Sequence, residues 1–273
     1  MIISELEKFL IGWHIKLQWE DGEIEQFEIV SSVEPKNSYY QIRNDSALVQ
    51  SLSSVKVGNT GHFRVNNDDK YISYKLLEMT NPKLEECIKN RNLTTIYHYT
   101  QTANLLSILK NGIYSKSELW SRRIKFAQND KERIDNKLDC INCSLEYPNN
   151  RLMFKEKINN NTRFCLIALD ISVLREIFSL CCPTNAAKYS GKSIIPISQI
   201  ENLFIGERSE NFPVNYPTDE QAEILIKKHI PIKFIKAVIF ENDYDYNQLK
   251  NSIPENVKCI VSDKLFRMRG NYE

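Results

Sequence analysis

The chain has 273 residues and a formal net charge of +1, with 42% hydrophobic and 26% charged side chains. This composition is typical of a globular protein and excludes a disordered or collagen-like chain. No run of about 18 apolar residues occurs, so we expect no membrane-spanning helix. The N-terminus lacks the basic cluster of a secretory signal, and we therefore expect a cytoplasmic protein.

Charge is unevenly distributed along the chain. Residues 1–90 carry 10 basic and 14 acidic side chains, a net charge of −4, whereas residues 91–273 carry 26 and 21, a net charge of +5. A mildly basic C-terminal part favours local contact with a polyanion, although no field over the whole molecule attracts one. A chance fluctuation in composition explains the same difference equally well.

The cysteine pattern bears on redox state and on metal binding. Cys140 and Cys143 form one CxxC pair, and Cys181 and Cys182 are adjacent, but no second regularly spaced pair follows. A structural zinc site usually needs such a second pair. We therefore expect reduced, partly buried thiols and no metal site.

Residues 1–90 are predicted to form a small, mostly β domain. Apolar and polar side chains alternate over residues 13–30, which predicts two strands around the turn Asp21-Gly22. Further strands are expected at 39–42, 61–65 and 71–76. Pro82 and a charged helical stretch then separate this domain from the rest of the chain.

The segment YQIRNDSALVQSLSSVKVGNTGHFRV lies within this domain and resembles the C-terminal domain of GreA-type transcription factors. The resemblance extends over about residues 39–79. Ala47 stands where that family has proline, and Asn59 where it has aspartate. The resemblance implies a module that docks a protein partner such as RNA polymerase, and a generic β accessory domain is the alternative.

From Thr94 the pattern changes to that of an α+β domain, expected over residues 91–273. The β-branched and aromatic run TTIYHYT predicts a strand, after which Thr102 is expected to cap a helix that Gly112 ends. The other expected elements are strands at 138–144, 163–169, 232–240 and 257–261 and helices at 172–179 and 246–251.

Five short blocks follow one another in this second domain. They are YHYT at 97–100, NDKERID at 129–135, LDCINCSLEYPN at 138–149, CCPTNAAK at 181–188 and YPTDEQAE at 216–223. Their order and spacing resemble the DarT family of ADP-ribosyltransferase toxins, which modify bases in single-stranded DNA, over about residues 94–242. The likeness is closest to the branch of that family associated with guanine rather than thymine.

The resemblance implies an α+β fold, with an ADP-ribosyltransferase-like split β-sheet core behind a small β-rich N-terminal domain. It also implies NAD as a substrate and no metal. Breaking the bond between nicotinamide and ribose develops positive charge on the sugar, which a nearby carboxylate stabilises. In the family this carboxylate is the Glu of Q-A-E, which corresponds to Glu223 here and can also accept a proton from the attacking group.

The local pattern around Glu223 is ambiguous. Thr218 and Gln221 have the spacing of a helix capping box, which would make Glu223 a solvated acid at a helix start. The β-branched residues Ile224 and Ile226 favour a strand instead, and we expect the strand.

The remaining site residues are also assigned by the resemblance. Arg133, from the D-x-E-R motif, would hold the pyrophosphate or orient the reacting groups, although such a charged stretch is usually a solvated face. His98 would contact the adenosine ribose, although a histidine on an apolar strand is often a core residue. The expected cofactor-binding residues are His98, Thr100, Asn104, Ser144 and Tyr147.

The predicted acceptor is a base in single-stranded DNA, because a base must be unstacked to enter a pocket. Arg122, Arg123 and Lys125 form a basic cluster beside Trp120 and Phe126, which suits contact with a single strand, and an ordinary amphipathic turn is the alternative. Asn185 in PTNAAK is a further candidate on the acceptor side.

The resemblance implies a bacterial toxin or phage-defence effector with a de-ADP-ribosylating macrodomain antitoxin as partner. Two rival functions stay open. The first is an ADP-ribosyltransferase acting on RNA or protein. The second is a non-catalytic, transcription-associated binding module that meets a protein partner through residues 1–90.

Overall fold

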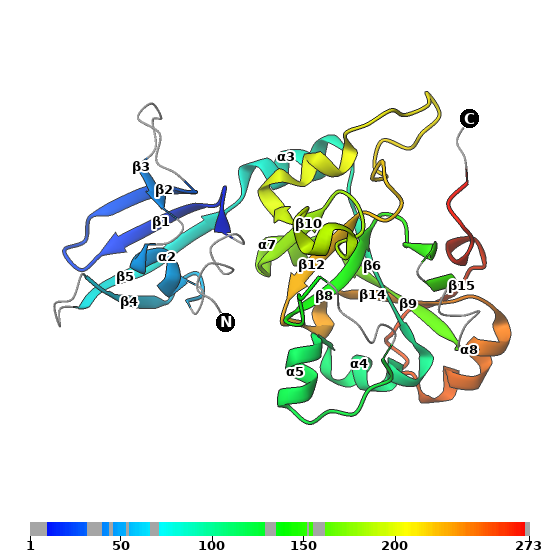
Figure 1. The fold of residues 1–273 in the computed structure, drawn as a ribbon. Coiled ribbons are helices and arrows are strands. Elements are labelled where there is room, and N and C mark those ends of the chain that lie inside the picture. The colour runs from blue at the N-terminus through cyan, green and yellow to red at the C-terminus, as the bar shows by residue number, and fades with distance from the viewer. Residues whose placement is uncertain are drawn as a thin grey trace. The chain divides into compact units, whose positions relative to one another are not determined.

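The structure, a computed structural model, describes residues 10–31, 40–43, 46–52, 55–65, 71–128, 135–151, 153–154 and 162–270 (Figure 1). The chain divides into two compact units. The first comprises Met1–Cys87 and Ile195–Ile200, and the second comprises Ile88–Ile194 and Glu201–Glu273. The domain limits of 1–90 and 91–273 stay a prediction about separately folding parts of the chain.

The first unit contains a five-stranded sheet in the order β3-β2-β1-β5-β4. Its elements are β1 (His14–Trp19), β2 (Ile24–Val30), β3 (Tyr40–Arg43), α2 (Ala47–Leu52), β4 (Thr60–Arg64) and β5 (Tyr71–Thr80). Strands β1 and β2 pair antiparallel around the predicted turn, where Gly22 has a φ of 91°. Alternation buries Ile15 and Leu17 on the core face, so the predicted hairpin is confirmed.

The second unit contains a larger sheet whose strands run in the order β10-β12-β8-β6-β9-β14-β15 (Figure 1). These strands are β6 (Thr95–Gln101), β8 (Cys140–Leu145), β9 (Phe164–Asp170), β10 (Ser179–Cys182), β12 (Glu223–Lys227), β14 (Ile235–Phe240) and β15 (Cys259–Val261). Strands β7 (Ile113–Tyr114) and β13 (His229–Ile230) form a separate pair. Strand β11 (Ile195–Pro196) falls in the segment assigned to the first unit.

Strand β8 changes partner along its length. Its residues 140–143 pair with β12, whereas Ser144 and Leu145 pair with β6. The larger sheet is therefore split at β8, with β12 and β10 on one side and β6, β9 and β14 on the other. This arrangement confirms the predicted α+β class with a split sheet.

Helices and short helical turns connect these strands. They are α3 (Pro82–Asn90), η1 (Thr102–Asn104), α4 (Leu105–Asn111), α5 (Lys116–Ser121), α7 (Val173–Glu176), η2 (Lys188–Gly191), η3 (Ile197–Phe204), η4 (Ile232–Phe234), α8 (Asp243–Leu249), η5 (Lys250–Ser252) and η6 (Lys264–Phe266). Strands β9 and β14 are apolar runs and supply most of one core cluster, which includes Phe164, Leu166 and Ile239. Among the described residues, none of these helices has the length and apolar character needed to span a bilayer.

Three of the predicted elements differ from the structure. The helix expected at 172–179 is reduced to α7, because the apolar run that follows pairs with β12 as strand β10. The strand expected from residue 232 begins with the turn η4. Thr102 caps no helix: it opens the 3₁₀ turn η1, and α4 begins only at Leu105.

Gly112 ends α4 as predicted, with a φ of 80°. A Cβ added there would collide with the carbonyl oxygen of Ile230 and lie 2.6 Å from Nε2 of His229, because β13 crosses the chain at this point. We expect Gly112→Ala to lower the free energy of unfolding by at least about 3 kcal/mol, combining backbone strain with the collision.

Chemical denaturation of the full chain measures this loss, and Gly191→Ala is the control. Gly191 lies in the same unit with a similar φ of 78°, but an added Cβ would lie 3.2 Å from its nearest neighbour, the carbonyl oxygen of Asp135. The control should lose about 1 kcal/mol, mainly from backbone strain, because a contact at 3.2 Å requires only a small shift of its neighbour. Equal losses in the free energy of unfolding for the two variants would contradict the close approach of β13 to Gly112.

Candidate active site

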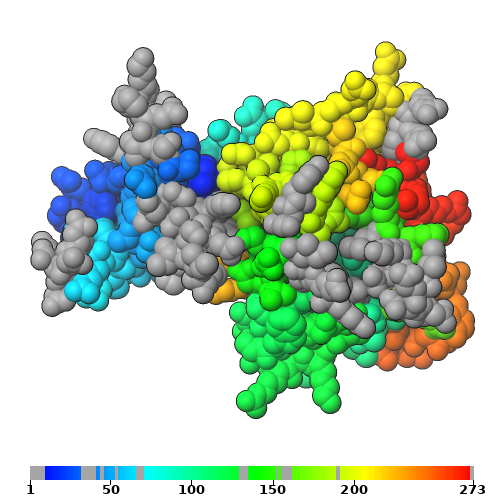
Figure 2. Space-filling view, in the orientation of Figure 1, coloured from blue at the N-terminus to red at the C-terminus, as the bar shows by residue number. Residues whose placement is uncertain are grey.

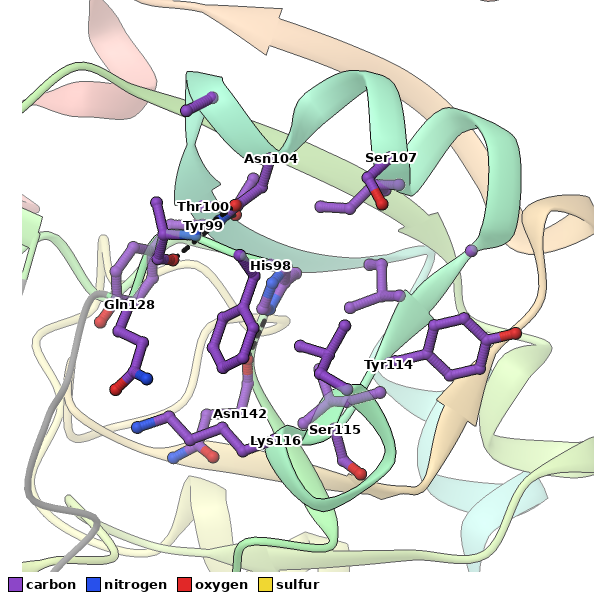
Figure 3. A pocket seen from close by; sticks show the side chains of 18 of the residues that line it. His98, Tyr99, Thr100, Asn104, Ser107, Tyr114, Ser115, Lys116, Gln128 and Asn142 are labelled. Carbon is purple, nitrogen blue, oxygen red and sulfur yellow. Dashed lines mark hydrogen bonds between the residues drawn. The ribbon is translucent and has the colours of Figure 1, made fainter. Parts of the chain in front are cut away.

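A pocket in the second unit is bounded by β6 and β8 on one side and by α4 and α5 on the other (Figure 3). Residues 125–128, between α5 and β8, close a further side. Figure 3 shows side chains from these regions converging on one space. Its lining residues include His98, Thr100, Asn104, Lys116, Lys125 and Asn142.

His98 is oriented by the neighbouring strand. Its Nδ1 lies 3.0 Å from the backbone carbonyl oxygen of Asn142, and because a carbonyl only accepts, Nδ1 must donate. Burial lowers the pKa of His98, and the bond to Asn142 opposes this shift only in part. The ring is therefore neutral near pH 7, with Nε2 as its acceptor.

Thr100 and Asn104 shape the pocket through contacts within the protein. Asn104 Nδ2 donates to Thr100 Oγ1 at 3.1 Å and to the carbonyl oxygen of Ala127 at 2.9 Å. Asn104 Oδ1 accepts from the Ala127 amide at 2.8 Å. Gln101 adds a bond to the carbonyl oxygen of Gln128 at 3.1 Å. Together these bonds fix residues 127–128 against the end of β6.

Glu223 is the first residue of β12 and is buried, so the expected strand is confirmed. Its Oε2 accepts from Asn142 Nδ2 at 3.1 Å and from the Ala186 amide at 3.4 Å. Burial, together with the nearby Glu223 carboxylate, raises the pKa of Cys143, which keeps that thiol neutral. The acid thus lies at the split in the sheet, held by donors from β8 and from the CCPTNAAK block.

Asn142 connects two of the predicted site residues, His98 and Glu223. Its carbonyl oxygen binds His98 and its side-chain amide binds Glu223. No motif in the sequence assigned a role to Asn142. The available signal was an asparagine inside the largely apolar run of β8, but its partners follow only from the register between β8 and β12.

Ser144 and Tyr147 do not line the pocket. Ser144 Oγ accepts from the Asn149 amide at 2.9 Å. The Tyr147 hydroxyl donates to the carbonyl oxygens of Lys264 and Arg267, at 3.1 and 3.2 Å. Both side chains therefore bond within the protein, and their contact with a cofactor stays a prediction. Arg133 lies outside the described residues.

The basic cluster is divided between the pocket and the surface. Lys125 and Phe126 line the pocket. Arg122 covers the Tyr114 ring at 4.7 Å and pairs with Glu118 at 3.2 Å. Trp120 is 49% exposed on α5, whose surface is green in Figure 2. Asn185 Oδ1 accepts from the Ala187 amide at 2.8 Å and so orders the turn that presents the Ala186 amide to Glu223.

Three arginines hold the segment Val214–Thr218, which leads into Glu223. Arg269 donates to the carbonyl oxygens of Pro217 and Thr218 at 2.6 and 2.8 Å. Arg208 binds the hydroxyl of Thr218 at 2.9 Å and the carbonyl oxygen of Tyr216, and Arg91 binds the carbonyl oxygen of Val214 at 3.2 Å. The guanidinium groups pack against the rings of Phe204 and Phe212.

We expect Arg269→Met to lower the free energy of unfolding by about 2 kcal/mol, because it removes two hydrogen bonds from a charged donor. Amide exchange in residues 216–222 should rise at the same time, and hydrogen exchange with mass spectrometry measures it. The control is Arg267→Met, whose guanidinium is 73% exposed and pairs with Asp263 across one helical turn. A rise of equal size in the control would argue against the anchoring role of Arg269.

Comparisons with known proteins bear on the same part of the chain. The family model for DarT, described as ssDNA thymidine ADP-ribosyltransferase, matches residues 97–266. No curated protein matches the chain.

Solved structures show weak similarity to the chain. Thermosipho africanus DarTG in complex with ADP-ribose shares 19% identity at a TM-score of 0.49, covering 65% of this chain and 52% of that one. Thermus sp. 2.9 DarT in complex with NAD+ shares 12% identity at a TM-score of 0.43, covering 64% and 98%. The same Thermus protein in complex with ADP-ribosylated ssDNA shares 12% identity at a TM-score of 0.47, covering 64% and 96%.

The family assignment rests on the extent of the family-model match. Residues 97–266 are more than half of the 273-residue chain, and they include His98, Asn142 and Glu223. This protein therefore belongs to the DarT family of ADP-ribosyltransferases.

Proposed function

We propose that this protein transfers ADP-ribose from NAD to a nucleobase in single-stranded DNA. The observation that carries the proposal is the pair of contacts that Asn142 makes with His98, at 3.0 Å, and with Glu223, at 3.1 Å. These contacts join a pocket to a buried carboxylate inside the segment that the family model matches. NAD is a substrate here, because its bond between nicotinamide and ribose is broken in the reaction.

His98 binds the adenosine half of NAD in this proposal. With Nδ1 committed to the carbonyl oxygen of Asn142, Nε2 of the neutral ring accepts a hydrogen bond from a ribose hydroxyl. Lys116 and Lys125 line the same pocket and provide positive charge for the pyrophosphate. Arg133 is proposed to add to this charge or to orient the reacting groups, as the resemblance of its motif implies.

Glu223 carries the chemistry. As the bond between nicotinamide and C1′ breaks, its electron pair leaves with nicotinamide, and the carboxylate stabilises the positive charge on the ribose. A nitrogen of the base then forms the new bond to C1′, and its proton passes to Glu223. The hydrogen bonds from Asn142 and Ala186 favour the ionised carboxylate that both steps require.

We propose guanine as the acceptor base. The support is the resemblance of the blocks SLEYPN and PTDEQAE to the guanine-associated branch of the family. The description of the family model names thymidine instead, so the two bases are the alternatives that an experiment must separate.

The test uses labelled NAD and a panel of single-stranded oligonucleotides that contain either guanine or thymine as the only candidate acceptor. Label on guanine-containing DNA alone supports the full proposal. Label on thymine-containing DNA would show that thymine, and not guanine, is the acceptor base. Transfer only to matched RNA or to protein would contradict the DNA substrate. The absence of transfer to any acceptor would contradict the enzymatic function and favour a binding module.

The proposal includes a toxin role with a macrodomain antitoxin that removes the modification. Support comes from family membership and from the resemblance described above. Wild-type protein should arrest bacterial growth, and co-expression of a de-ADP-ribosylating macrodomain should restore it. Growth arrest that persists in Glu223→Gln would contradict the catalytic origin of toxicity.

Residues 1–90 are proposed as an accessory domain that binds a protein partner.

A further inference from the structure

We infer that Asn142 is a positioning residue that holds the Glu223 carboxylate in its reactive orientation. This inference rests on the proposed function and names a residue that acts on the same site. The side chain and the backbone of Asn142 have different roles. The side chain fixes the acid, and the backbone carbonyl independently fixes His98.

The strand register explains how the side chain of Asn142 reaches Glu223. Asn142 pairs with Leu225, and Glu223 lies two residues before Leu225 on β12. Side chains two residues apart in a strand share one face of the sheet, so Asn142 and Glu223 are diagonal neighbours on that face. Asn142 also lines the pocket beside His98 (Figure 3), whereas Glu223 is not among the lining residues, so the contact links a pocket residue to a carboxylate outside the lining.

Hydrogen-bond chemistry fixes the orientation of the amide. An ionised carboxylate only accepts, so the nitrogen of Asn142 must face Glu223 at 3.1 Å, and Oδ1 must point elsewhere. Within the part of the chain that the structure describes, Oδ1 is buried and has no hydrogen-bond partner. A buried acceptor without a partner costs stability, so the amide at this position is not explained by the fold. The hydrogen bond that the side-chain amide donates to Glu223 explains why an asparagine stands at this position.

The backbone contact allows the two tasks to be separated experimentally. Substitution of the Asn142 side chain leaves its carbonyl oxygen in place, so His98 keeps its donor contact and its orientation. The account therefore predicts that variants at position 142 bind NAD normally and fail in transfer. A variant with a purely structural defect would lose both properties together.

The test combines Asn142→Leu and Asn142→Asp, each assayed with saturating oligonucleotide over a range of pH. Asn142→Leu should lower kcat by at least about tenfold while KM for NAD stays within about twofold, since binding and chemistry depend on different atoms. Asn142→Asp keeps the shape but replaces the donor with a second carboxylate. It should move the acidic limb of the kcat profile to higher pH by about one unit, because a like charge raises the pKa of Glu223.

The control is Asn150→Leu, because Asn150 is also buried with an Oδ1 that lacks a partner in the described residues, and it lies outside both the pocket lining and the five blocks. Thermal unfolding of all three variants detects any failure to fold. Unchanged kcat and an unmoved pH profile in both Asn142 variants would overturn the inference, and so would parallel losses of kcat and NAD binding.

A readout without turnover separates this inference from the proposed function. Carbon-13 NMR of labelled glutamate follows the titration of the Glu223 carboxyl group in wild type and in both Asn142 variants. A raised pKa in the variants supports the contact even if wild-type protein modifies no oligonucleotide. An unchanged Glu223 titration in both variants overturns it, whatever the outcome for the enzyme.

Discussion

We expect Glu223→Gln to lower kcat for ADP-ribose transfer by at least about 10³-fold and to leave KM for NAD within about threefold. The amide that replaces the carboxylate has nearly the same shape but carries no charge to stabilise the cationic ribose. It also accepts no proton from the attacking base. Single-turnover transfer from labelled NAD to an oligonucleotide measures the loss, and calorimetry measures NAD binding.

The matched control for this variant is Glu220→Gln. Glu220 lies three residues before Glu223 and forms an ion pair with Arg151, so the same charge is removed from the same segment. Its side chain is 20% exposed and pairs with Arg151, whereas Glu223 accepts from Asn142 and Ala186. We expect kcat to change by no more than about twofold, within the range of surface ion pairs. A comparable loss of kcat in both variants would contradict the catalytic role of Glu223.

His98→Ala has the second-largest expected effect, and it acts on binding. The variant should weaken NAD binding by about 10- to 100-fold, because a ribose hydroxyl loses its acceptor inside a partly buried pocket. Calorimetric titration of NAD measures the change. Asn142 keeps its bond to Glu223 in this variant, so saturating NAD should restore most of kcat.

The pH dependence of NAD binding tests which form of His98 is active. Burial lowers the pKa of His98 below its ordinary value of about 6.5, so the neutral ring predominates at every higher pH. Wild-type affinity should therefore stay constant from about pH 6.5 upward, and protonation should alter it only on acidification. Affinity that falls as the pH rises through 6.5 would show instead that the imidazolium binds NAD.

Much of the fold could be predicted because the local signals agree with the tertiary structure. Alternation between residues 13 and 30 matches a sheet with one buried face, and Gly112 has the positive φ that a helix end requires. At Glu223 the β-branched run outweighed the capping-box spacing. The turn at Asp219, whose carboxylate accepts from the Gln221 amide, ends just before the strand.

The remaining features depend on contacts that no local pattern encodes. Strand β10 was not predicted: the expected helix ended at residue 179, and the apolar residues that follow it are explained only by pairing with β12. Asn142 meets Glu223 through the register of two strands that lie 81 positions apart in sequence. The segment before Glu223 is anchored by Arg91 and Arg269, which lie 123 residues before and 52 residues after the residues they bind.

The block resemblance assigned roles to residues but gave no information on their contacts. His98 binds the backbone carbonyl oxygen of Asn142, and Glu223 binds the side-chain amide of the same residue. Asn104, from the same blocks, uses its amide to hold Ala127, and Tyr147 uses its hydroxyl to hold the C-terminal turn. A motif specifies residue types at a spacing, whereas side-chain contacts depend on the packing of distant segments.

The central claim is that the Glu223 carboxylate drives transfer of ADP-ribose from NAD to a base in DNA. Intact-mass and fragmentation mass spectrometry of a single-stranded oligonucleotide, incubated with NAD and with wild type or Glu223→Gln, tests it most directly. The account predicts that wild type adds one ADP-ribosyl group, that fragmentation places it on a guanine, and that Glu223→Gln adds none. The claim would be contradicted if wild-type protein binds NAD but leaves the oligonucleotide unmodified. It would also be contradicted if wild type and Glu223→Gln modify the oligonucleotide equally.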